Sequence, residues 1–239
     1  MDDTMTETVS DGATHAGAQH FCRTVRATAG LPAEPRILVA GCGRGHEALF
    51  IRQTLGGSLV GIDIDEFWEP ELGRDLDGFE LSVASVQELP YPDDSFDIVF
   101  YHHVIEHVPD PAGSLAELSR VLRPGGLIYI GTPNRHRLVG YIGSFDATTA
   151  QKLKWNLKEY GQRLTGRFRN EKGAHAGFSA RELRRLLGAA RFTDITFLTG
   201  EYLTFKYGAK LPKPVLRAVC SDPLREVAAP SVYVTARAR

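Results

Sequence analysis

The stretch Ile37–Gly45, ILVAGCGRG, decides how this chain is organised. Its first four residues are apolar and predict a buried strand, after which Gly41, Gly43 and Gly45 follow at alternate positions. A helix-compatible run, residues 47–55, comes next. A strand, a glycine-rich turn and a helix in this order are typical of the first unit of a nucleotide-binding α/β domain, in which glycine lets the backbone approach a ligand.

The next apolar segment ends in a carboxylate. Residues 58–63, SLVGID, are apolar up to Asp63, and a carboxylate at the end of a second strand can accept hydrogen bonds from both hydroxyls of a ribose. The glycine spacing is G-x-G-x-G, whereas dinucleotide-binding proteins have G-x-G-x-x-G; His46 stands where that fingerprint has Gly or Ala. The spacing therefore argues against a dinucleotide, and an ordinary strand-to-helix turn stays open as the simpler alternative.

The composition fits one α/β domain. The chain has 239 residues, of which 43% are hydrophobic and 24% are charged, and its net charge of -1 gives no field that would attract nucleic acid. The cysteines Cys22, Cys42 and Cys220 form no C-x-x-C pair, so we expect a reduced cytoplasmic protein without a structural metal. No apolar run approaches membrane-spanning length, and the N-terminus lacks an apolar signal core.

The remaining chain alternates strand patterns with helix patterns. Residues 1–14 are polar and predict a disordered tail, and residues 15–239 are expected to form a single domain. Strands are predicted at 58–63, 79–83, 96–102, 127–131, 192–198 and 231–236, and helices at 15–29, 47–55, 110–122 and 179–190. Strands separated by helices indicate a mostly parallel sheet with helices on both faces.

Two long stretches interrupt this alternation, at about 135–175 and 200–230. Apolar residues in the first stretch recur at helical spacing and predict an amphipathic helix: Leu153, Leu157, Tyr160 and Leu164. The stretch is rich in Lys and Arg, and if its apolar residues form one stripe we expect the helix to pack over the site as a lid. The second stretch mixes basic and apolar residues over 205–219, which leaves peripheral contact with a membrane open.

Further motifs follow in a fixed order. Ser85–Asp97 (SVQELPYPDDSFD), His103–Asp110 (HVIEHVPD) and Thr132–Arg135 (TPNR) come after the third, fourth and fifth predicted strands. With the glycine loop and the segments 120–126 and 175–192, they resemble the class I S-adenosylmethionine (SAM) methyltransferases, nearest the ubiquinone-biosynthesis O-methyltransferase branch. The resemblance implies a Rossmann-like α/β fold, with a seven-stranded, mostly parallel sheet whose last strand is antiparallel.

The resemblance also implies SAM as the cofactor and assigns its site. The glycine loop would hold the methionine side, and residues at the ends of the second, third and fourth strands would hold the ribose, the adenine and the amino group. The residues concerned are Gly41, Cys42, Gly43, Gly45, Asp63, Ile64, Ser85, Val86 and His102. Many members carry a carboxylate at the positions of Val39 and Ser85, so these two departures bear on the expected affinity for SAM.

The candidate catalytic residues are histidines after the fourth predicted strand. Methylation of a hydroxyl needs alignment of the nucleophile with the methyl group and removal of a proton, and His is the usual base near neutral pH. His103 is the first choice as the base, with an orienting or structural role for His107. The alternative is that His102, His103 and His107 all only shape the cofactor loop through hydrogen bonds. Glu106 is expected to be structural, and His136 and His175 are weaker candidates.

The predicted function is SAM-dependent methylation of a small molecule at a hydroxyl oxygen. The basic insertion favours an anionic or glycosylated acceptor. Nucleic acid is not expected as a partner, because the sequence has no Asn/Asp-Pro-Pro-Tyr-type motif for holding a flipped base. A non-catalytic SAM-binding or scaffold protein and a nicotinamide-dependent oxidoreductase stay open as alternatives.

Overall fold

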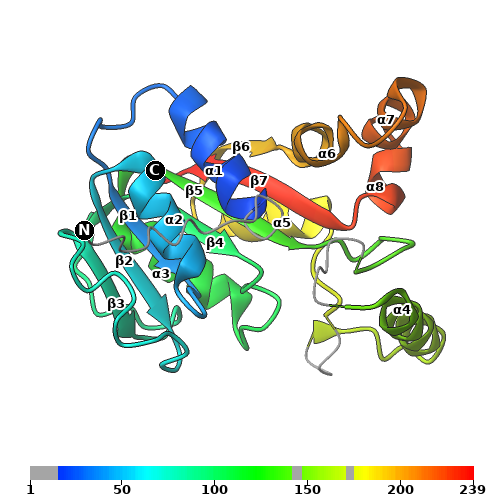
Figure 1. Ribbon diagram of the computed structural model, residues 1–239, viewed down its shortest axis with the longest axis horizontal. Coiled ribbons are helices and arrows are strands. Elements are labelled where there is room, and N and C mark those ends of the chain that lie inside the picture. The colour runs from blue at the N-terminus through cyan, green and yellow to red at the C-terminus, as the bar shows by residue number, and fades with distance from the viewer. Residues whose placement is uncertain (1–15, 142–146, 171–174) are drawn as a thin grey trace, which may run out of the picture.

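Figure 1 shows the computed structural model, in which a central sheet lies between two layers of helices. The structure describes residues 16–141, 147–170 and 175–239, so the predicted tail at 1–14 lies outside the described residues. The strands are β1 (Arg36–Ala40), β2 (Ser58–Asp63), β3 (Phe79–Val83), β4 (Phe96–His102), β5 (Leu122–Pro133), β6 (Thr193–Phe197) and β7 (Ser231–Arg237). The helices are α1 (Ala16–Ala27), α2 (His46–Leu55), α3 (Pro111–Val121), α4 (Thr149–Leu164), α5 (Ala180–Ala189), α6 (Thr199–Tyr207), α7 (Lys213–Cys220) and α8 (Leu224–Ala228).

The sheet has seven strands in the order β3-β2-β1-β4-β5-β7-β6. Neighbouring strands from β3 to β5 are parallel, and β7 is antiparallel to both β5 and β6. This confirms the predicted sheet and its antiparallel last strand. The strand predicted at 127–131 begins earlier, because Leu122 already pairs with Phe96 before the register shifts.

Alternating side chains give the sheet two buried faces. Ile37 and Val39 of β1 pack with side chains of α1, α2 and α6 on one face. Leu38 and Ala40 of the same strand pack with side chains of α3 and α5 on the other. Because both faces are covered, the ends of the parallel strands are where a ligand can reach the sheet.

Local sequence fixes the ends of the helices near that edge. The Asp110 carboxylate accepts hydrogen bonds from the backbone N–H groups of Ala112 and Gly113, and Pro111 occupies the first turn of α3. Ser179 caps α5 in the predicted capping box, with Glu182 hydrogen bonded back to its backbone N–H.

Arg120 on α3 anchors the loop between β3 and β4. Its guanidinium donates to the carboxylates of Glu117 and Asp93 and to the carbonyl oxygens of Leu89 and Tyr91. The hydrogen bond from Arg120 lowers the pKa of Glu117. The Arg120 contacts hold the loop against the helix, so the residues at its start have a fixed position beside β2.

The two insertions fold differently. Residues 199–228 form α6, α7 and α8, and α6 packs against α1 and β7. The first insertion contains α4, which stands to the side of the sheet in Figure 1. Within the residues described here, no helix is long and apolar enough to cross a bilayer.

The predicted lid is wrong in its orientation. The apolar stripe of α4 faces outward: Leu153, Leu157 and Leu164 are 61%, 64% and 90% exposed. The buried side chain on the opposite face of the helix is Glu159, which forms an ion pair with Arg137. Leaving a buried charge unpaired costs more free energy than exposing a leucine, so the ion pair determines which face of the helix turns inward.

Candidate functional site

The glycine loop joins β1 to α2 in a backbone conformation that favours glycine. Gly41, Gly43 and Gly45 have φ angles of 79°, 51° and 79°. A Cβ at Gly41 would lie 2.2 Å from Cγ2 of Val104, whereas a Cβ at Gly43 would have no atom within 4 Å. Gly41 is therefore required by packing, and Gly43 leaves open space in front of the loop.

Asp63, the last residue of β2, is bound to this loop. One oxygen of its carboxylate accepts the backbone N–H of Gly43 at 2.7 Å, and the other accepts the N–H of Ile64 at 2.8 Å. Since each carboxylate oxygen has two lone pairs, both oxygens keep acceptor capacity for a ligand. The strand end therefore offers a charged acceptor beside the open space at Gly43.

A cavity of about 390 Å³ brings most of the predicted site residues together. It lies where β1, β2 and β4 end and where the loops after β3 and β4 begin. Its lining consists of Gly41, Gly43, Asp63, Ile64, Ala84, Ser85, Val86, Gln87, His103, Val104, His107, Val108 and Pro109. The cavity therefore joins predicted cofactor residues to both predicted catalytic histidines.

Three predicted cofactor residues do not line this cavity. Cys42 is buried, and burial together with the charge of Asp63 raises the pKa of its thiol to about 12, so the side chain is a neutral packing group. Gly45 caps α2, and a Cβ there would lie 2.6 Å from Leu72 and 2.8 Å from Leu81. Their direct contact with a cofactor stays a prediction.

The third residue outside the lining is His102, whose ring is buried beneath α1. Its Nδ1 lies 3.5 Å from the Glu47 carboxylate, and the ring fills the space in front of Gly17 and Gly131. Burial lowers the pKa of His102, and the neighbouring His103 lowers it further. The side chain thus packs on the sheet, and a contact of its backbone with a cofactor stays a prediction.

His103 points its imidazole toward a buried carboxylate. Its Nδ1 lies 3.3 Å from Oε1 of Glu106, and the two side chains are 42% and 1% exposed. The other oxygen of Glu106 accepts the hydroxyl of Thr132, on β5, at 2.9 Å. Burial alone would raise the pKa of Glu106, but the hydrogen bond and charge of His103 and the Thr132 contact hold it below the ordinary value.

This arrangement gives Glu106 a partner that the sequence did not indicate. The two residues are three positions apart but lie outside a helix, and the left-handed backbone of His103, with φ of 56°, brings them face to face. When the buried carboxylate accepts a hydrogen bond from Nδ1, Nε2 is the ring nitrogen of His103 that is left for the cavity, and the structural role expected of Glu106 stays a prediction.

The other candidate histidines are His107, His175 and His136. His107 lines the cavity, and its ring meets that of His175 edge to face, with centroids 4.7 Å apart, so His175 lies beside the cavity lining. His136 lines a different cavity of about 640 Å³ near α5 and α8. That larger cavity contains no residue of the glycine loop, which makes the smaller one the candidate site. In the part of the chain that the structure describes, no group of three or more His, Cys, Asp or Glu residues could hold a metal ion.

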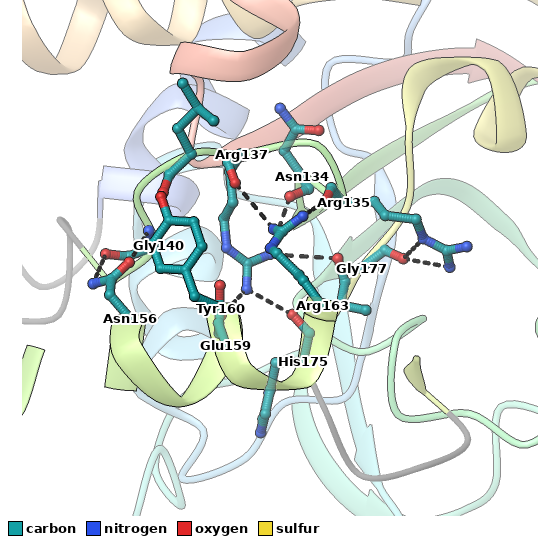
Figure 2. A network of polar contacts seen from close by, with 12 residues as sticks. Asn134, Arg135, Arg137, Gly140, Asn156, Glu159, Tyr160, Arg163, His175 and Gly177 are labelled. Carbon is teal, nitrogen blue, oxygen red and sulfur yellow. Dashed lines mark hydrogen bonds and ion pairs between the residues drawn. The ribbon is translucent and has the colours of Figure 1, made fainter. Parts of the chain in front are cut away.

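Arg137 links the candidate site to α4. Figure 2 shows its guanidinium at the centre of a polar network, paired with Glu159 and donating to the carbonyl oxygens of Asn134 and His175. Arg163 of α4 donates in turn to the carbonyl oxygens of Arg135 and Arg137. The inward-facing cations of this insertion are thus already bound within the chain.

Residues 38–130 match a family model described as "Methyltransferase domain". A probable S-adenosylmethionine-dependent methyltransferase from Mycolicibacterium smegmatis is 38% identical over 99 residues, which cover 41% of this chain and 38% of that protein. A ubiquinone biosynthesis O-methyltransferase from Hahella chejuensis is 37% identical over 117 residues, which cover 45% of this chain and 47% of that protein. The matches thus span less than half the length of these relatives.

The solved structures agree on the fold. The crystal structure of an S-adenosylmethionine-dependent methyltransferase from Mesorhizobium loti has a TM-score of 0.61 and 17% sequence identity, covering 95% of this chain and all of that one (100%). The matched domain holds the glycine loop, the carboxylate of Asp63 and the segment after β4 that together line the cavity. Over residues 38–130 the chain is thus similar in sequence to SAM-dependent methyltransferases, and its fold is that of the class I enzymes.

Proposed function

We propose that this chain binds SAM in the cavity at the ends of β1, β2 and β4 and transfers its methyl group to a small molecule, at a hydroxyl oxygen. The observation that carries the proposal is the shared cavity, in which Gly43, Asp63 and His103 line one space. A ribose-binding carboxylate and a base within one cavity are what methylation of a hydroxyl requires.

The residues present fit SAM. The open space at Gly43 accepts a ligand against the backbone, Asp63 has spare acceptor capacity, and Ile64 is 72% exposed at the cavity and offers an apolar surface for a base. Ser85 and Val86 lie at the same wall. Bound there, SAM would supply an electrophilic methyl group on a sulfonium whose thioether is a good leaving group. The protein's task is then to align the acceptor and to remove its proton.

His103 is the proposed base. Its Nδ1 faces Glu106. In the neutral imidazole, an Nδ1–H that donates a hydrogen bond to that carboxylate leaves Nε2 unprotonated, and Nε2 can then accept the hydroxyl proton. When the imidazole takes up the proton, the buried charge of Glu106 stabilises the cation. Thr132 holds the second carboxylate oxygen, which keeps Glu106 oriented toward His103. Glu106 is thus a positioning residue for the proposed base.

The charge of the acceptor is not constrained by the insertion. Arg137 is paired with Glu159, and Arg163 is bound to two carbonyl oxygens. Lys154 and Lys158 lie on the exposed side of α4. An anionic or glycosylated acceptor therefore stays a prediction that these contacts do not test, and we propose only a hydroxyl-bearing small molecule.

Calorimetry with SAM, followed by incubation with methyl-tritiated SAM and a panel of phenols and aliphatic alcohols, tests the proposal. We expect SAM to bind and label to appear on at least one hydroxyl. Binding without transfer across the panel would favour the non-catalytic alternative. Hydride transfer to a nicotinamide, followed by absorbance, would favour the oxidoreductase.

The base is tested with His103→Asn, because asparagine tolerates the left-handed backbone at this position. General-base catalysis contributes typically about 10²–10⁴-fold, so kcat should fall by that factor while SAM affinity stays nearly constant. His136→Asn is the matched control, since His136 lines the other cavity. Equal activity of both variants would place the base elsewhere, and loss of SAM binding by His103→Asn would make His103 a residue of the cofactor site.

A further inference from the structure

Helix α4 turns its apolar face to solvent and its charged face to the protein, the reverse of an ordinary surface helix. A surface helix normally turns its apolar stripe to the core and its polar face to water. In α4 the leucines at 153, 157 and 164 are exposed, and the fully buried side chain is Glu159. An apolar stripe that points away from the protein needs a partner outside it.

The reversed orientation is held by a polar network. Figure 2 shows Arg137, on the segment after β5, reaching Glu159 of α4, while Asn156 receives the N–H of Gly140 at 2.7 Å. Arg163 adds two hydrogen bonds from the last turn of the helix. Rotating the leucines inward would remove Glu159 from Arg137 and leave that buried guanidinium without its carboxylate partner, at a large cost.

The exposed stripe continues onto the neighbouring segment. The hydroxyl of Tyr160 donates to the carbonyl oxygen of Leu138, which places Leu138 beside the helix, and Leu138 and Val139 are 56% and 50% exposed. From Leu153 to Leu164 the stripe runs for about 16 Å along the helix axis, since each residue rises about 1.5 Å. We call this surface the α4 stripe: Leu138, Val139, Leu153, Leu157, Tyr160 and Leu164.

The charges beside the α4 stripe are basic. Lys154 and Lys158 are exposed and one turn apart on the same flank of the stripe, and Arg167 and Arg169 are exposed just beyond the end of the helix. The acidic residue of α4, Glu159, is buried against Arg137. Any partner of the stripe therefore meets apolar side chains bordered by positive charge.

We propose that the α4 stripe docks on the surface of an anionic lipid bilayer, with α4 lying in the plane of the interface. Leucines on one face and lysines that can reach the headgroups are the composition of an interfacial helix. A second copy of this chain on the same face would bring Lys154 and Lys158 of both copies together with no exposed carboxylate on α4 to offset them. A bilayer also needs no matching groove for a single row of side chains. The proposal is independent of the methylation proposed above.

Sedimentation with vesicles tests the docking. Vesicles of phosphatidylcholine alone are compared with vesicles that contain about one third phosphatidylglycerol. Each basic side chain near an anionic surface contributes roughly fivefold to binding, so Lys154→Glu with Lys158→Glu should weaken binding to the anionic vesicles about 25-fold or more. Leu157→Gln with Leu164→Gln should weaken it at least about tenfold. These side chains are exposed, so both variants should keep the circular dichroism and Tm of the wild type.

Lys210→Glu with Lys213→Glu is the matched control, because it makes the same charge change on the other basic segment, where Lys210 follows α6 and Lys213 begins α7. We expect this control to bind like the wild type. Equal loss in the control and the α4 variants would move the contact to α6 and α7 and overturn the proposal. Absence of wild-type sedimentation with anionic vesicles would overturn it as well. Self-association without vesicles, abolished by the leucine variant, would make the stripe an interface between protein molecules instead.

Discussion

Replacing Asp63 by alanine tests the ligand site before any acceptor is known. In the structure each oxygen of the carboxylate accepts one backbone N–H, from Gly43 and from Ile64, and keeps one lone pair for a ribose hydroxyl. Hydrogen bonds to a charged group contribute about 1.5–3 kcal/mol each, and water recovers part of that sum in the free protein. Loss of the pair should therefore weaken SAM binding by roughly 2–4 kcal/mol, which corresponds to about 30- to 1,000-fold in Kd.

The assay is titration calorimetry with three ligands: SAM, adenosine and methionine. Affinity for SAM and for adenosine should fall by a similar factor, because both carry the ribose, while any affinity for methionine should change little. Asp65→Ala is the control: it removes the same charge two residues away, and Asp65 accepts the N–H of Glu66 outside the cavity lining. Unchanged SAM affinity in a folded Asp63→Ala protein, or an equal loss in the control, would refute the assignment.

Three further predictions concern the glycine loop and the proposed base. Glu106→Gln should lower kcat about 10- to 100-fold with SAM affinity unchanged, measured by single-turnover transfer, since it removes the charge that stabilises protonated His103; a change in SAM affinity alone would contradict this role. The pKa of Glu106 in the folded protein lies below its ordinary value of 4.5, so the Glu106 carboxylate stabilises the fold above pH 4.5 and loses this contribution as the pH falls below it. The Tm difference between wild type and Glu106→Gln should therefore be full at neutral pH and shrink in acid. Gly41→Ala should destabilise the fold by about 1–3 kcal/mol in chemical denaturation, and Val104→Ala should restore part of that stability. Gly43→Ala should chiefly weaken SAM binding, because a Cβ there enters the open space in front of the loop.

Strand positions were predictable from the sequence because they depend on local pattern. The strands predicted at 58–63, 79–83 and 96–102 match β2, β3 and β4 residue for residue. The ends of these strands carry the site, so the ordered motifs were enough to predict most of the cavity lining. Strand alternation could also have placed His102: it shares the parity of Ile98 and Phe100, whose face is covered by α1 and α2.

The orientation of α4 was not predictable from its own sequence. Helical spacing shows that Leu153 and Leu157 share a face, but it does not show which way that face turns. The direction is decided by Glu159 and its partner Arg137, 22 residues earlier in the chain. The partnership of His103 with Glu106 was hidden for a similar reason, because it depends on a left-handed residue that no local pattern announced.

The left-handed backbone at position 103 makes different demands on the stability of the fold and on the proposed catalysis. Residues with a Cβ are disfavoured at a φ of 56°, glycine has no such penalty, and asparagine tolerates it better than most. A library randomised at this position and selected only for thermal stability should therefore enrich glycine and asparagine. The same library selected for methyl transfer should return histidine, and the divergence between the two selections would measure what the fold gives up to hold an imidazole at the cavity wall.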